Sequence, residues 1–116
     1  MLNKINRLTK KKEFESVYKK GRSSFDKIIG VKTISNNLNL NRFGIIVSIK
    51  ISKQAVIRNK VKRRLREAVR LEINDLKPGN DIIIITLPSI KESEFTDISN
   101  SLKKHFYRLY LYETKR

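Results

Sequence analysis

The chain has 116 residues, and 27 Lys and Arg against 11 Asp and Glu give it a formal net charge of +16. It contains no cysteine, which excludes a disulfide framework, a thiolate nucleophile and a zinc ribbon. Self-repulsion of this size weakens a compact state, so we expect a polyanionic partner. Nucleic acid ranks ahead of a membrane surface, because no Trp is present to face a membrane.

Residues 1–9 are basic and unpatterned, and we expect them to form a flexible arm of one domain spanning residues 1–116. No apolar run approaches transmembrane or signal-peptide character, which predicts a cytoplasmic protein. A helix is predicted from Thr9, as its cap, to a stop at Gly21. On it, Phe14, Val17 and Tyr18 share one face by their i, i+3, i+4 spacing.

Three β-rich stretches follow. They are "FDKIIGVKTIS" from residue 25, with an additional strand near its start, "RFGIIVSI" from residue 42 and "DIIIITLP" from residue 81. The last stretch has almost no polar residue, which predicts a strand covered on both faces. Ser93 is the predicted cap of a final helix. The predicted fold is therefore α+β, an α-β sandwich of one four-stranded sheet and three helices.

The most basic element runs from about residue 55 to residue 74, and six of the nine residues from Arg58 to Arg66 are cationic. At 100° per residue its apolar residues form one helical stripe: Ile57, Val61, Leu65, Ala68 and Val69. Glu67 is the single nearby counter-charge on the helix. We therefore predict a helix that docks by its stripe and presents cations to phosphates, in preference to a merely solvated charged face.

Other residues allow two interpretations each. Asn59 either caps the basic helix or contacts RNA. Phe14 and Tyr18 either pack in the core or form a surface on which single-stranded bases stack, and the Lys10 region favours the second. His105, the only histidine, is predicted to be a partly buried residue with satisfied hydrogen bonds. We predict no catalytic residue in the polypeptide and assign no metal ligand.

The stretch "KISKQAVIRNKVKRRLRE" and the opening "RLTKKKEFESVYKKG" resemble the bacterial ribonuclease P protein subunit. The family pattern RNxxKRxxRE matches Arg58-Asn59, Lys62-Arg63 and Arg66-Glu67. The family's opening-helix pattern matches Phe14, Val17, Tyr18 and Gly21.

This resemblance implies a partner, the catalytic ribonuclease P RNA, and a substrate, precursor tRNA, whose 5′ leader is removed. Magnesium ions are implied as the cofactor, held mainly by the RNA, and neither a membrane nor protein oligomerisation is required. It also implies a fold similar to a ribosomal protein S5 domain, with a left-handed βαβ crossover. The implied contacts to the catalytic RNA are Arg58, Asn59, Lys62, Arg63, Arg66, Lys50 and Lys53. The implied leader-binding residues are Phe14, Val17, Tyr18 and Lys10.

Two departures from the family pattern concern the loop before the basic helix: Ile49 replaces a frequent cation and Ser52 a frequent glycine. Three alternatives stay open from the residues. A ribosomal or other structural RNA-binding protein would give no stimulation of tRNA maturation. A DNA-binding regulator would need a half-site in duplex DNA. An autonomous nuclease would have to cleave RNA with metal and no RNA partner.

Overall fold

The computed structural model describes residues 4–113. Its helices are α1 (Lys11–Lys20), α2 (Ala55–Glu72) and α3 (Phe95–Arg108), and short 3₁₀ turns occur at Lys4–Asn6, Ile73–Asp75 and Pro88–Glu92. Its strands are β1 (Arg22–Phe25), β2 (Ile29–Ser35), β3 (Arg42–Ile46) and β4 (Asn80–Thr86). This order confirms the predicted three helices and four strands, including the additional strand near Phe25. Within the described residues, no helix combines the length and apolar character that a membrane span needs.

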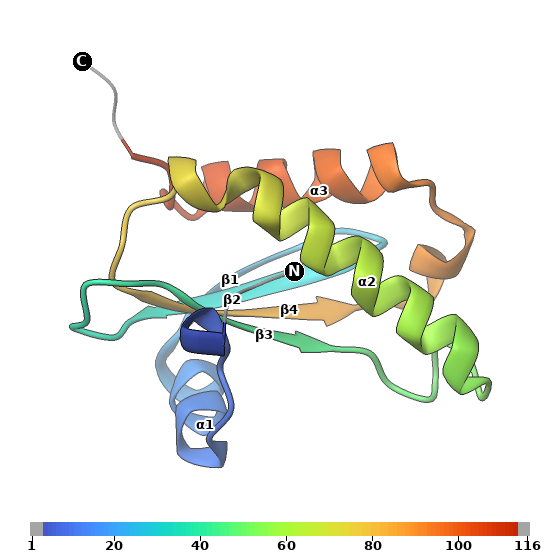
Figure 1. The fold of residues 1–116 in the computed structure, drawn as a ribbon, viewed down its shortest axis with the longest axis horizontal. Coiled ribbons are helices and arrows are strands. Elements are labelled where there is room, and N and C mark those ends of the chain that lie inside the picture. The colour runs from blue at the N-terminus through green and yellow to red at the C-terminus, as the bar shows by residue number, and fades with distance from the viewer. Residues whose placement is uncertain (1–3, 114–116) are drawn as a thin grey trace.

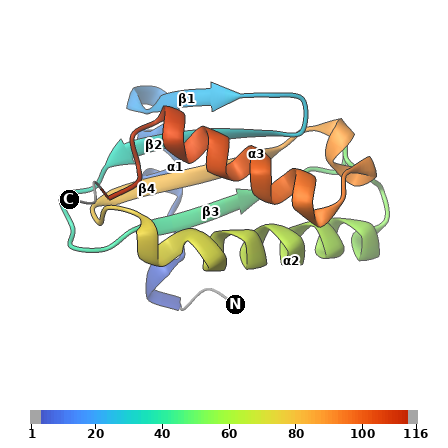
Figure 2. The same cartoon turned by 90° about the horizontal axis from the view of Figure 1, so that it is seen from above.

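The four strands form one mixed sheet in the order β1-β2-β4-β3. β1 and β4 both run antiparallel to β2, whereas β3 runs parallel to β4 with Arg42 opposite Asp81. The chain leaves β3, passes through α2 and returns as β4. This β3-α2-β4 crossover is left-handed, as Figure 2 shows from the α2 side of the sheet. It departs from the general right-handed preference of parallel crossovers and agrees with the geometry that the family resemblance implies.

The sheet lies between two unequal layers of helix, with α2 and α3 on one face and α1 on the other (Figure 1). Ile82 and Ile84 of β4 belong to the larger core under α2 and α3. Ile83 points to the other face and packs with Leu8 and Val17 in the smaller core under α1. Alternate side chains of one strand thus enter two cores, as the uninterrupted apolar run predicted.

α1 begins and ends at features that the sequence indicated to within one residue. Lys10 is its N-cap in place of the predicted Thr9, because the Glu13 carboxylate accepts the backbone N–H of Lys10 at 3.0 Å. At the other end, a Cβ on Gly21 would lie 2.4 Å from the carbonyl oxygen of Val17 and 2.9 Å from that of Thr33. Glycine therefore allows the chain to leave α1 in close contact with β2.

The other two helices also differ slightly from prediction. α3 begins after Glu94 and not after Ser93, since the backbone N–H of Glu94 donates to the Asp97 carboxylate at 3.0 Å. α2 ends at Glu72, two residues before the predicted end, and the chain tightens there into a 3₁₀ turn.

The prediction of a flexible arm over residues 1–9 does not hold for the part that the structure describes. Arg7 forms a parallel bridge with Phe43, and the backbone N–H of Leu8 donates to the Phe43 carbonyl at 2.8 Å. The Leu8 side chain is buried under α1. This one apolar side chain anchors a segment that otherwise looked like a charged tail. Residues 1–3 of the predicted arm lie outside the described residues.

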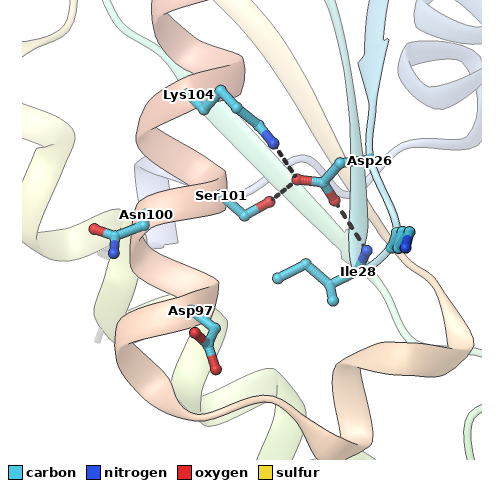
Figure 3. Close-up of a pocket in the computed structure, with 7 residues that line it drawn as sticks. Asp26, Ile28, Asp97, Asn100, Ser101 and Lys104 are labelled. Carbon is cyan, nitrogen blue, oxygen red and sulfur yellow. Dashed lines mark hydrogen bonds and ion pairs between the residues drawn. The ribbon is translucent and has the colours of Figure 1, made fainter.

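A polar cluster fixes α3 to the turn between β1 and β2 (Figure 3). The Asp26 carboxylate accepts the backbone N–H groups of Ile28 and Ile29 at 2.9 and 3.0 Å and the hydroxyl of Ser101. Lys104 places its Nζ 3.0 Å from the same carboxylate. Burial alone would raise the pKa of Asp26, but these hydrogen bonds outweigh it and hold the pKa well below its usual range.

His105 completes this cluster from the inner side of α3. Its Nδ1 lies 2.7 Å from the Ser24 hydroxyl oxygen and its Nε2 lies 3.1 Å from Asp26 Oδ2. Nδ1 thus has a hydrogen-bond partner, but Nε2 forms no hydrogen bond within the described residues, and the side chain is fully buried. The prediction of a partly buried histidine with satisfied hydrogen bonds was therefore wrong on both counts. Burial lowers the pKa of His105 against the opposing attraction of Asp26.

We predict that the free energy of unfolding falls as pH is lowered through about 6.5, the ordinary pKa of histidine. Because the pKa of His105 is lower in the folded chain, the unfolded chain binds a proton below pH ~6.5 that the folded chain does not bind. The slope approaches ~1.4 kcal/mol per pH unit between the two pKa values. Urea unfolding between pH 5 and 7 measures it, and His105→Leu should remove the slope because the chain has no other histidine. An unchanged slope in that variant would contradict the assignment.

Candidate nucleic-acid interface

α2 is docked by the apolar stripe that the sequence predicted. Val61, Leu65, Ala68 and Val69 are buried, and Ile57 is half-buried. Most of the intervening residues are cations. We call this outward side the cationic face of α2, comprising Arg58, Lys60, Lys62, Arg63, Arg64 and Arg66. The helix therefore holds its charges on a rigid backbone at the surface.

The charges of this face are not neutralised by the rest of the described chain. Glu67 forms an ion pair with Arg70, whose Nε lies 2.9 Å from Glu67 Oε2, and this contact lowers the pKa of Glu67. Arg58 and Arg64 donate only to the backbone carbonyls of Ser52 and Ser93, at 2.8 and 3.4 Å. Among residues 4–113, no cation from Arg58 to Arg66 forms an ion pair. The cations of this face therefore repel one another, and binding of a polyanion would relieve this repulsion.

The loop before α2 carries Lys50 and Lys53 into solvent while Ile51 is buried as its anchor. The Ser52 hydroxyl oxygen accepts the backbone N–H of Gln54 at 3.1 Å, so serine fits this loop where the family often has glycine. Ile49 is 70% exposed, and it adds no charge to this loop.

Asn59 does not cap the helix. α2 begins at Ala55 after Gln54, which places Asn59 in the second turn with its side chain exposed. The capping interpretation was therefore wrong, and the amide is available to an external partner. The sequence was ambiguous because no Ser, Thr, Asp or Asn stands directly before Ala55 to mark the start of the helix.

The residues predicted on one face of α1 separate in the structure. Tyr18 is 43% exposed and Phe14 is half-buried, whereas Val17 is fully buried in the smaller core. The Val17 side chain supports this surface from below and does not reach it, which corrects its predicted direct contact with RNA. We call the exposed surface of Phe14 and Tyr18, together with the exposed Lys10, the α1 wall.

Lys32 of β2 is a neighbour of this wall that sequence reasoning missed. Its Nζ lies 5.3 Å from the centre of the Tyr18 ring, a distance typical of a cation–π contact. Burial raises the pKa of the Tyr18 hydroxyl. The sequence "IIGVKTIS" gave a signal, since Lys32 is the one cation on β2, whose other residues are mostly buried.

A cavity of about 160 Å³ along the outer edge of β3 brings the two predicted sets of residues together. Phe14 of the α1 wall lies on one side, and Lys62 and Arg66 of α2 lie on the other. We call this cavity the β3 groove, and its lining is completed by Arg7, Leu8, Thr9, Phe43, Gly44 and Ile45. One aromatic ring and several cations therefore line the same cavity at the surface.

Gly44 determines how deeply Phe14 is seated in the groove. A Cβ at Gly44 would lie 2.6 Å from the ring of Phe14, closer than such atoms approach. The ring therefore rests directly on the backbone of β3, and only its outer part faces the groove.

The described residues also show what this surface lacks. Within residues 4–113, no group of three or more His, Asp or Glu side chains is placed to hold a metal ion. His105 and Asp26 could have suggested acid-base chemistry, but both lie near the turn between β1 and β2 and not at this surface. His105 is fully buried, and the carboxylate of Asp26 accepts hydrogen bonds from Ile28, Ile29 and Ser101. The surface is suited to binding and positioning an anionic strand.

Comparison with known proteins agrees with this description. The chain matches the family model described as Ribonuclease P over residues 2–110. It is 39% identical over 97 residues to the ribonuclease P protein component of Alkaliphilus metalliredigens, covering 84% of this chain and 86% of that protein. It is 36% identical over 115 residues to the protein component of Caldanaerobacter subterraneus, covering 99% and 98%.

Solved structures give the same result for the fold. The RNase P protein of Staphylococcus aureus superposes with a TM-score of 0.85 at 32% identity, covering 93% of this chain and 98% of that one. The RNase P protein of Thermotoga maritima, in complex with 1-(4-fluorophenyl)-2-thiourea, superposes with a TM-score of 0.77 at 29% identity, covering 84% and 94%.

We predict that Arg63→Ala weakens binding to a bacterial ribonuclease P RNA and flattens the slope of log affinity against log salt by roughly 0.7 to 0.9, the loss of one phosphate contact. Arg70→Ala is the matched control, because it removes the same charge from the same helix at a position already paired with Glu67. Filter binding over a salt series measures both variants. Equal slopes for Arg63→Ala and the wild type would reject the phosphate contact.

Proposed function

Because the chain belongs to the ribonuclease P protein family, we propose that the cationic face of α2 docks on the catalytic RNA while the α1 wall and the β3 groove hold the 5′ leader of precursor tRNA. The chain is a protein subunit of a ribonucleoprotein endoribonuclease that acts in tRNA processing. This membership removes the ribosomal and DNA-regulator alternatives. The β3 groove is the observation that carries the assignment of the leader.

The two surfaces suit two kinds of RNA contact. The catalytic RNA is a fixed partner, and a rigid helix with unneutralised Arg and Lys can meet several of its phosphates at once. Arg58, Asn59, Arg63, Lys50 and Lys53 are the residues that we assign to it. Their backbone is already ordered, so little conformational entropy is lost when the RNA binds.

The leader differs in sequence between tRNAs, so its site has to accept any base. Stacking on Tyr18 and on the exposed part of Phe14 meets this requirement, because every base has a flat face. Lys10 of the wall and Lys32 beside Tyr18 can contact the leader backbone. Lys62 and Arg66 line the groove, and we propose that they lie where the leader passes close to the catalytic RNA.

Catalysis in this family is RNA-based and generally depends on magnesium. We propose that the RNA subunit holds these ions, because phosphate oxygens are the hard ligands that Mg²⁺ prefers and a protein of net charge +16 repels cations. The same positive charge offsets repulsion between RNA segments, which is how the protein would sustain activity at low magnesium.

We propose that the whole chain works as one RNA-binding domain, without a membrane and without protein oligomerisation. Its place of work would be the cytoplasm, where precursor tRNA is made. The arrangement of residues 4–113 around one sheet supports the single domain.

We predict that Tyr18→Ala lowers the affinity of the assembled complex for precursor tRNA by about 5- to 150-fold, the loss of one base stacked on an aromatic ring. Affinity for mature tRNA, which lacks the leader, should stay the same. Tyr107→Ala is the matched control, since Tyr107 is a 76% exposed tyrosine on α3, across the sheet from α1. Equal losses for precursor and mature tRNA would assign Tyr18 to folding and contradict the leader site.

A further inference from the structure

One guanidinium joins three elements of the fold behind the α1 wall. Arg42 of β3 donates from Nε and Nη2 to the two carboxylate oxygens of Asp81 on β4, each at 2.8 Å. Its Nη1 donates to Oε2 of Glu13 on α1. The side chains of Arg42, Asp81 and Glu13 are only 22%, 6% and 15% exposed. The ion pairs are therefore shielded from solvent and from salt more than surface pairs are.

Glu13 links Arg42 to the first turn of α1. Its second oxygen, Oε1, accepts the backbone N–H of Lys10 at 3.0 Å and lies 3.4 Å from that of Thr9. One carboxylate thus caps the first turn of the helix and binds the guanidinium on the sheet. Phe14 is the next residue in the chain, so its ring position depends directly on where Glu13 is held.

The apolar contact under α1 is small and comes from Val17 and the half-buried Phe14. α1 has ten residues, and Val17 is the one that is fully buried among them. A short helix held by few contacts can tilt or slide on a sheet. A bidentate Arg-carboxylate pair has a defined direction as well as an energy, so it restricts this motion in a way that apolar contact cannot.

We propose that Arg42 and Glu13 are positioning residues for the leader, and that their ion pair fixes the position of the α1 wall and of Phe14 in the β3 groove. This inference rests on the proposed function. Neither residue stacks on the leader itself. Arg42 is held by Asp81, Glu13 is held by Arg42, and Phe14 is placed by Glu13.

The sign of the charge on Glu13 supports this role. A carboxylate beside a surface that binds an anionic strand repels that strand, so electrostatics alone would favour its absence. Shielded ion pairs also add little net stability compared with apolar residues of similar size. Capping of the first turn of α1 accounts for a carboxylate at position 13, and its contact with Arg42 additionally fixes the helix in position on the sheet.

The test compares Glu13→Ala with Glu15→Ala in the assembled complex of protein and ribonuclease P RNA. Both variants remove one negative charge from α1, but the Glu15 side chain is exposed and away from Arg42. The measurement is the ratio of affinities for precursor tRNA and mature tRNA. We expect Glu13→Ala to lower this ratio at least about fivefold below that of Glu15→Ala, the loss of one weakly stacked base. Affinity for ribonuclease P RNA should be equal in the two variants.

Glu13→Gln is a second variant, whose amide keeps one acceptor oxygen. Its ratio of affinities for precursor and mature tRNA should therefore lie between those of Glu13→Ala and the wild type. Equal ratios for Glu13→Ala and Glu15→Ala would overturn the inference, as would a Glu13→Ala protein that loses affinity for both tRNAs equally through a change in folding. A wild-type complex with no preference for the leader would overturn the proposed function and this inference together. The first two outcomes leave the proposed function standing.

Discussion

Burial of one apolar stripe holds the most highly charged part of this protein in place. Val61, Leu65 and Val69 of α2 are buried against the sheet and α3, and each such side chain contributes about 1.5 to 3 kcal/mol. Like charges one turn apart on the cationic face cost only about 0.2 to 0.5 kcal/mol per pair. Burial therefore outweighs repulsion several-fold. The helix can carry unneutralised cations to an RNA without unfolding, and β3 and β4 are connected through it.

Sequence periodicity was sufficient to predict which side chains are buried wherever burial depends on a single element. The stripe on α2 and the uninterrupted "DIIIIT" run of β4 each predicted which side chains are buried, and both predictions are confirmed. The same reasoning was too coarse for α1. Val17 shares a face with Phe14 and Tyr18, but periodicity does not show which of three neighbours points to the middle of the sheet. Val17 does, above Ile83, and Tyr18 lies at the margin beside Lys32.

Contacts between distant segments were beyond this reasoning. The packing of Leu8 under α1 and the β3 groove depend on how separate segments meet at one sheet edge. The Arg42–Asp81 pair had a detectable signal, because each residue directly precedes an apolar run and parallel register places the two side by side. The contact of Glu13 with Arg42 had no such signal, since 29 positions separate the two residues and an acidic residue is common in the first turn of any helix. Local pattern predicted the two surfaces, and tertiary contacts determine how they are aligned.

The most direct test of the separation between the two RNA surfaces is site-directed crosslinking, which the absence of cysteine makes simple. Lys10→Cys on the α1 wall and Arg63→Cys on the cationic face of α2 would each carry a short photocrosslinker in the assembled complex with labelled precursor tRNA. We predict that the probe at position 10 labels the 5′ leader and that the probe at position 63 labels the catalytic RNA. Leader crosslinks from position 63 with none from position 10 would contradict the account.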